Sequence, residues 1–251
     1  YGTTDINTYA LETRGGVLVG LFKTEKVYAT TGTFYPDADP ETSSVDGFVM
    51  HEGGGNDAWN TLRNAVGSSA DDTNITAEGA FIQSGTSAWR QMRRAIFLFD
   101  TSAIGEANII SNAVLSLYVL QKDDSLAITP DLAVVSSAPA SNTALVAGDF
   151  DSLGTTDFAT RLTYASATAS AYNDITLNAS GISNISKTSI SKFGTRNGQY
   201  DLDNVAPTYT ASNFSQIRIS NSDTTGTSQD PKLTVTYTVP ITPKQDVIWF
   251  E

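Results

Sequence analysis

Short runs in which apolar and polar residues alternate recur along this chain, and they limit its fold more than any other feature. The clearest is Lys232–Val239, where four apolar residues alternate with one lysine and three threonines. A period of two is that of a strand with one buried and one solvated face. Further strand-like runs lie at Val45–His51, Arg93–Phe99, Ala107–Gln121, Leu126–Ser136, Asn173–Leu177, Ser189–Thr195 and Phe214–Ser220. This pattern predicts an all-β fold.

Helical patterns are few and short. Asn178–Lys187 predicts one or two turns capped by Asn178, and Asn60–Ala65 predicts another. Neither reaches the roughly 11 residues of an average helix, so the alternating helices of an α/β fold are missing. Pro130 also places the middle of Leu126–Ser136 at a sheet edge or a bulge. We therefore predict an antiparallel β-sandwich, specifically a jelly roll, with N- and C-terminal extensions.

The 251 residues fit one β domain with an extension at each end. We predict an N-terminal arm at 1–32, the β-sandwich at 33–239 and a C-terminal tail at 240–251. The tail carries an apolar cluster, which is costly at a chain end unless it is covered. These predicted assembly contacts are Val247, Ile248, Trp249 and Phe250. The tail docks either on a neighbouring subunit or on its own domain.

Composition excludes several kinds of chemistry. The chain has no cysteine, one histidine and a net charge of −12. Cysteine-based zinc sites, iron–sulfur clusters and disulfides are therefore impossible. The negative charge disfavours nucleic acid and anionic membrane surfaces as partners. No apolar run reaches the ~18 residues of a membrane helix, so we expect no membrane insertion.

Six stretches of sequence occur in an order that resembles the DNRLRE-type extracellular domains, which are similar to a carbohydrate-binding module family with a jelly-roll fold. They are Phe34–Ala38, Ala95–Ile104, Ala113–Tyr118, Tyr172–Asp174, Ile185–Lys187 with Lys192–Gly194, and Asp230–Tyr237. Relatives with this pattern look like stand-alone proteins of environmental bacteria and their phages. The resemblance covers about residues 33–239. It implies a β-sandwich in an extracellular or virion setting, and it does not imply an enzyme.

Aromatic residues beside polar or turn residues are candidates for a glycan site, since sugar rings pack on aromatic faces. The candidates are Trp59, Trp89, Tyr172, Tyr200 and Tyr209. Arg90, Arg93 and Arg94 follow Trp89 and are suited to bidentate recognition of an acidic sugar. The alternative is that Trp89 and Arg94 belong to the packed or ion-paired part of a strand.

The sequence predicts no catalytic site. The sequence has no Gly-x-Ser-x-Gly motif that would supply a nucleophilic serine for His51 to activate. We therefore interpret His51 as an exposed or structural histidine. Most of the carboxylates lie in turn-like sequence, where Asp is expected to cap its own backbone.

Some turn carboxylates suit a hard cation. Asp37, Asp39 and Glu41 alternate, and Asp46 or Asp230 would add further oxygen ligands. Calcium takes 6–8 such oxygens without a fixed motif. We expect no required cofactor, and we keep a structural calcium at Asp37, Asp39, Glu41 and Asp230 as an alternative to solvated turn carboxylates.

Together these features predict a non-enzymatic structural or decoration protein, exposed on a virion or an extracellular assembly, with glycan or cell-surface adhesion as an added role. Its partners would be either copies of itself in a homo-oligomer or capsid or filament proteins, and the adhesion role would add a polysaccharide. It would be located extracellularly or on a virion surface. The alternative is a secreted stand-alone carbohydrate-binding module. A polysaccharide-active enzyme is a third, disfavoured class.

Overall fold

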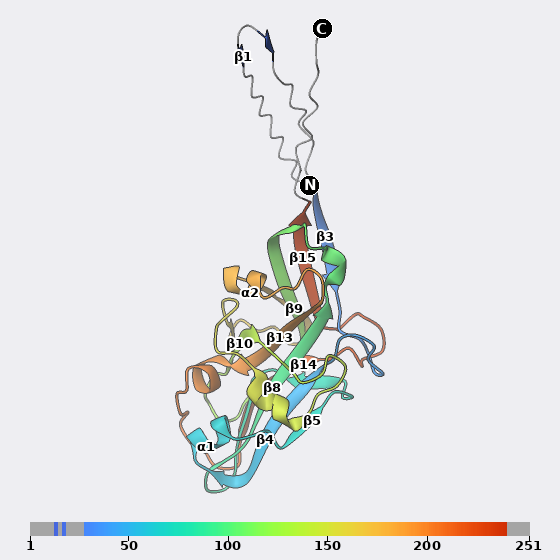
Figure 1. Cartoon of the computed structure of the whole chain (residues 1–251). Helices are drawn as coiled ribbons and strands as arrows, with labels where there is room; N and C mark the ends of the chain where they lie inside the picture. Colours follow the sequence, from blue (N-terminus) through green and yellow to red (C-terminus); the bar gives the residue numbers. More distant parts are fainter. Residues whose placement is uncertain (1–12, 15–16, 19–27, 240–251) are drawn as a thin grey trace.

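The computed structural model describes residues 13–14, 17–18 and 28–239, and it confirms the all-β prediction (Figure 1). The strands are β1 (Thr13–Arg14), β2 (Val17–Leu18), β3 (Ala29–Phe34), β4 (Asp46–Asp57), β5 (Ser69–Asp71), β6 (Thr76–Glu78), β7 (Phe81–Ser84), β8 (Trp89–Asp100), β9 (Ile109–Asp124), β10 (Asp131–Ser136), β11 (Leu162–Thr163), β12 (Ala171–Thr176), β13 (Ile190–Asn197), β14 (Phe214–Ser220) and β15 (Lys232–Thr238). The helical segments are α1 (Trp59–Asn64), α2 (Ala179–Ser183), η1 (Ser102–Ile104), η2 (Ala147–Ser152) and η3 (Gly198–Leu202). None of these described helical segments is both long and apolar enough to cross a membrane.

The strands pair antiparallel in a sandwich-like arrangement whose main path is β11-β10-β13-β8-β7-β14-β9-β15-β3. β4 joins β8, β5 joins β4, β6 joins β14, and β12 joins β9. Strands β8 and β9 link the parts of the sheet, because each pairs with three other strands. The jelly-roll topology stays a prediction.

Strand β8 is buried on both faces, which explains the continuous apolar run in its sequence. Ala95, Phe97 and Phe99 contribute to one hydrophobic core. Ile96 and Leu98 contribute to a second core on the opposite face. Alternate side chains of a strand point to opposite faces, so a strand covered on both sides loses the alternation of a half-buried strand.

The predicted strand positions agree with the structure, and most differences lie at their ends. β14 has the predicted bounds, whereas β10 begins only at Asp131, because the preceding segment turns through positive φ at Ala127 (57°) and Thr129 (46°). Asn178 caps α2 as predicted, since its side chain accepts a hydrogen bond from the Gly181 amide.

The sheet begins earlier than the predicted domain. β3 starts at Ala29, inside the range assigned to the arm, and pairs with β15 over its whole length. Its sequence, ATTGTF, has no clear alternation of polar and apolar residues. β3 therefore lacks the alternation of apolar and polar residues from which β15 was predicted.

A buried ionic cluster ties β8 to β13 and η3. Both Asp201 carboxylate oxygens accept from Arg94 at 2.8 and 2.7 Å, and both accept from Arg196 at 2.9 and 2.6 Å. All three side chains are at most 5% exposed. Burial alone raises the pKa of Asp201, but the two guanidinium groups outweigh it and lower the pKa to about 2. We call this group the Asp201 cluster.

Substituting Asp201→Asn should destabilise the protein strongly. The change leaves two buried guanidinium groups without a counter-charge, which costs about 3–5 kcal/mol in free energy of unfolding. Denaturant unfolding at neutral pH measures this. Asp203→Asn is the matched control, because that carboxylate is 47% exposed and its ion pair with Arg161 is worth less than about 1 kcal/mol. Equal losses in both variants would contradict the assignment.

Candidate functional site

The structure brings four of the seven predicted glycan-binding residues together at one end of the molecule, which we call the tip. The rings of Trp59 and Trp89 meet edge to face with centroids 5.1 Å apart, and Trp89 meets Tyr209 in the same way at 5.6 Å. Trp59 and Trp89 are buried at 7% and 6% exposure, whereas Tyr209 is 38% exposed. The two tryptophans therefore support the tip from inside, and Tyr209 alone of the three presents its ring.

A β-bulge separates Arg90 from its neighbours. Along the β7–β8 pair, Gln91 faces Gln83 and Trp89 faces Ser84, so Arg90 is the extra residue. A bulge re-aims side chains. Trp89 consequently joins the buried core, while Arg90 reaches outward and pairs with Glu52 through contacts of 3.0 and 2.8 Å.

A polar hollow of about 390 Å³, which we call the tip pocket, lies beside these residues. Its lining is Glu52, Gly54, Gly55, Gln83, Ser84, Gly85, Thr86, Arg90 and Ser212. Tyr209 flanks it, because its hydroxyl donates to the Gly85 carbonyl at 2.8 Å. An ion pair, hydroxyls, an amide and exposed glycine backbone suit a ligand that both donates and accepts hydrogen bonds.

Arg90 alone of the seven predicted glycan residues lines the tip pocket, and Arg93, Tyr200 and Tyr172 are not among those gathered at the tip. Arg93 binds Glu78 at 2.7 Å and is packed between the rings of Phe48 and Phe81. Tyr200 is buried, and its hydroxyl donates to the Ile128 carbonyl. The three arginines of β8 thus have separate roles, since Arg94 belongs to the Asp201 cluster. Trp89 and Arg94 lie in the packed and ion-paired part of β8, which is the alternative that the sequence left open.

Tyr172 stands on β12, where Lys232 lies 3.9 Å above its ring and its hydroxyl donates to the Asp230 carbonyl. It also lines a hollow of about 520 Å³ with Arg161 and Asp174. Arg161 is already bound to Asp157 and Asp203, and these ion pairs raise its pKa. Its guanidinium is thus engaged within the protein.

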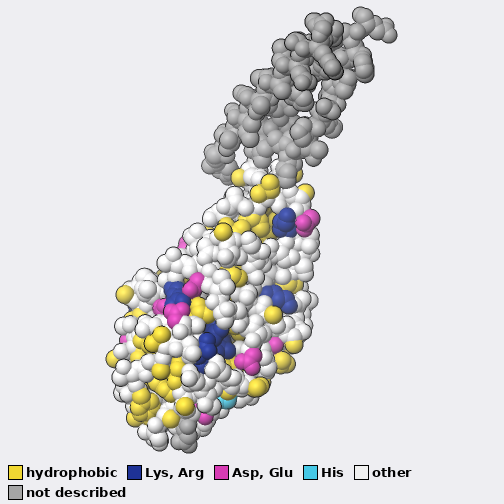
Figure 2. Space-filling model, turned by 60° about the vertical axis from the view of Figure 1, so that its left-hand side comes forward, with side chains coloured by type: hydrophobic (Ala, Val, Ile, Leu, Met, Phe, Trp, Pro, Cys, Tyr) yellow, Lys and Arg dark blue, Asp and Glu magenta, His cyan; other side chains and the backbone are white. Residues whose placement is uncertain are grey.

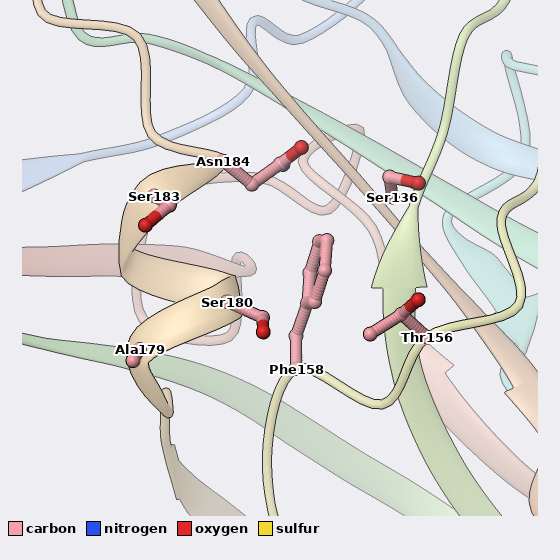
Figure 3. A pocket seen from close by; sticks show the side chains of 7 residues that line it. All are labelled: Ser136, Thr156, Phe158, Ala179, Ser180, Ser183 and Asn184. Atoms are coloured by element: carbon pink, nitrogen blue, oxygen red, sulfur yellow. The ribbon is translucent and has the colours of Figure 1, made fainter.

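A third hollow, of about 490 Å³, lies beside α2 (Figure 3). The Phe158 ring stands between Ser180 on one side and Ser136 and Thr156 on the other. Serines, a threonine, an asparagine, an alanine and this ring make up its lining. It offers hydroxyl groups but no charge.

His51 does not form a nucleophile–base pair with any hydroxyl in the part of the chain that the structure describes. Its Nδ1 lies 2.8 Å from the Val66 carbonyl, and its Nε2 lies 3.2 Å from Asp57 Oδ2. The ring is 16% exposed. This placement agrees with a structural histidine.

The predicted calcium ligands lie in loops that meet, but each makes different hydrogen bonds. Asp37 Oδ2 accepts from the amides of Thr42, Ser43 and Ser44, which is the capping expected of a turn carboxylate. Asp39 donates its amide to Asp223. Across the described ranges, no group of three or more carboxylate or imidazole side chains is arranged to hold a metal ion. Asp37, Asp39, Glu41 and Asp230 therefore do not form a shared set of ligands here.

Instead, these loops bury carboxylates beside one another. Burial, together with the charges of Asp223 and Asp230, raises the pKa of Asp46 to about 8 despite two hydrogen bonds from Ser222. Burial, and then the charge of Asp223, raise the pKa of Asp230 to about 6. Burial also raises the pKa values of Glu41 and Asp223. We call Glu41, Asp46, Asp223 and Asp230 the acidic loop cluster.

The predicted assembly contacts Val247, Ile248, Trp249 and Phe250 lie outside the described residues.

The acidic loop cluster should make the protein more stable in mild acid than in mild base. An unfolded Asp titrates near 3.9, so a carboxyl with a raised pKa binds its proton more tightly in the folded state. Its contribution is present below about pH 4 and is lost as pH rises through about 6 for Asp230 and about 8 for Asp46. Melting temperature measured from about pH 4 to pH 8.5 should therefore fall with rising pH.

Asp46→Asn removes the carboxyl group whose pKa is raised most in the acidic loop cluster. We expect it to raise the melting temperature at pH 8 by at least about 2–4 °C, the effect of 1 kcal/mol in a domain of this size, and to flatten the profile. Asp174→Asn, at an exposed strand carboxylate, should leave the slope unchanged. A wild-type protein that is most stable above pH 8 would contradict the assignment.

No protein-family model matches this chain, and no curated protein is significantly similar to it in sequence.

Proposed function

We propose that this chain is a non-enzymatic structural or decoration protein of a virion or an extracellular assembly, attached at one end and exposed to solvent at the other. The observation that carries the proposal is that the fold has two different ends. The start of β3 and the end of β15 lie side by side at one end, and α1 and the β4 turn lie at the opposite end (Figure 1).

The end at β3 and β15, which we call the attachment end, carries exposed apolar side chains. Tyr28 is 65% exposed, Ile109 is 59% exposed and Val239 is 62% exposed. The register places them together, because Thr238 pairs with both Ala29 and Ile109. Exposed apolar groups that gather at one place are typical of an interaction surface. The ranges 1–27 and 240–251 continue the chain from this end, which favours attachment through the terminal segments.

The rest of the surface suits exposure to solvent. On the face shown in Figure 2, charged side chains are scattered among uncharged polar and apolar groups. The net charge of −12 favours solubility. A polar pocket at the tip, far from the attachment end, supports an added role in adhesion to a glycan or a cell surface.

Attachment through the tail predicts self-association that depends on its apolar residues. We expect light scattering to give the full chain a mass that is a multiple of 26.7 kDa, and the full-length double variant Ile248→Asp/Phe250→Asp to be a monomer. Val146→Asp/Val205→Asp is the matched control, because those valines are exposed elsewhere on the domain. A monomeric wild-type protein would contradict self-assembly.

A secreted carbohydrate-binding module acting alone is the second candidate, and the tip pocket is the observation that favours it. Tyr209 offers an exposed ring next to the Arg90–Glu52 ion pair, a combination that suits a hydroxylated and partly acidic ligand. Trp89 and Tyr200 are unsuitable as probes of this site, since truncating a buried aromatic residue costs about 3–5 kcal/mol of stability.

Retention on gels that contain neutral and acidic polysaccharides tests the tip pocket. We expect Arg90→Ala to weaken retention about tenfold or more, the value of a lost hydrogen bond to a charged group, and Tyr209→Ala to weaken it as well. Tyr209→Phe keeps the ring and should bind better than Tyr209→Ala. Tyr35→Ala is the control, because Tyr35 has nearly the same exposure, 37%. Wild-type protein that runs unretarded on every gel would count against glycan binding.

A further inference from the structure

His51 lies between two hydrogen-bond acceptors. One ring nitrogen is 2.8 Å from the Val66 carbonyl, and the other is 3.2 Å from the Asp57 carboxylate. A carbonyl and an ionised carboxylate can only accept, so each contact requires a proton on the nitrogen that faces it. Both contacts exist together only when the ring is an imidazolium. A neutral imidazole, which carries one N–H, must give up one of them.

The contact with Asp57 holds the end of a glycine-rich excursion in β4. Glu52 pairs with Gln91 and Asp57 pairs with Trp89, so residues 53–56 stand out from the β4–β8 pair. Gly54 and Gly55 adopt φ values of 70° and 88°, which favour glycine. Gly53 leaves room for the Asp57 carboxylate, because a Cβ at this position would collide with it. The His51–Asp57 contact thus connects the two ends of the glycine-rich segment 53–56.

That segment forms one wall of the tip pocket. Gly54 and Gly55 line the pocket together with Arg90 and Gly85. Gly55 packs against Gly85, where a Cβ on Gly85 would come within 2.6 Å of the Gly55 Cα. Loss of the His51–Asp57 contact would therefore let Gly54 and Gly55 move, while Arg90 on β8 would stay in place.

The other charged groups around His51 are held by different partners. Glu52 on β4 pairs with Arg90 on β8, and Arg94 on β8 binds Asp201. Arg63 on α1 donates to the Asp201 carbonyl. On η2, Phe150 lies 6.4 Å from the His51 ring, Asp149 accepts from the amides of Ala140 and Val146, and Asp151 is exposed. Asp57 is therefore the carboxylate that responds to the charge of His51.

We propose that the His51–Asp57 contact is a pH-controlled latch: it closes when His51 is protonated, holds the Gly53–Asp57 wall of the tip pocket in place, and opens when His51 loses its proton. Histidine changes charge in the range of about pH 5 to 8. The latch rests on the proposed function only in treating the tip pocket as the recognition site. A ligand would then bind more tightly in mild acid than in mild base.

Nuclear magnetic resonance on the uniformly ¹⁵N-labelled full chain tests the latch without any ligand, so its outcome is independent of whether the pocket binds glycan. At about pH 5.5 we expect both His51 ring nitrogens to carry protons. The amides of Gly54 and Gly55 should then have order parameters of about 0.85, the value of a rigid backbone. At about pH 8 the order parameters should fall below about 0.6. Gly226, in an exposed turn with a φ of 79°, is the internal control and should not change.

Two variants distinguish the latch from a general effect of pH. His51→Gln removes the charge, so the two glycines should be mobile at both pH values. Asp57→Asn lets an amide donate to a neutral Nε2, so the glycines should stay ordered at both pH values. Unchanged order in the wild-type protein, or a pH step that persists in both variants, would overturn the proposal. If His51→Gln fails to fold, the wild-type step and its loss in Asp57→Asn still decide the question.

Discussion

The Asp201 carboxylate is the constraint on which the arrangement of this molecule depends most directly. It lies between Arg94 of β8 and Arg196 of β13, and its own backbone carbonyl accepts from Arg63 of α1. One buried carboxylate thus compensates two buried guanidinium groups on neighbouring strands. Because buried charges are tolerated only when paired in good geometry, the cluster sets how β8, β13, η3 and α1 lie relative to one another.

Strand β8 connects the Asp201 cluster to the tip. Its interior residues are buried on both faces, so it lies at the centre of the packing. Its first residues reach the tip, where the bulge at Arg90 turns Trp89 inward and sends Arg90 toward the pocket. The attachment end is built instead from β3, β9 and β15. The two ends therefore differ in chemistry, and the proposed attachment at one end and exposure at the other is based on this difference.

Much of the fold could be predicted from local sequence, but little of the candidate site could. β14 and β15 were found almost to the residue, and in β15 the period of two reports a half-buried strand directly. Arg90, Arg93 and Arg94 looked like one basic patch, yet they pair with Glu52, Glu78 and Asp201 in three separate places. The partners lie far away in sequence, and no local pattern indicates them. The Arg90 bulge likewise depends on how β7 and β8 pair.

Periodicity, turn residues and the missing helical patterns were sufficient to establish an all-β chain, since these signals act over a few neighbouring residues. Composition alone excluded cysteine chemistry and left His51 as the one imidazole. Tertiary structure decided which aromatics are buried, which carboxylates crowd together in the acidic loop cluster, and that His51 faces two acceptors at once. Burial and pairing are properties of segments that meet from distant parts of the chain, so they exist only once the strands are assembled.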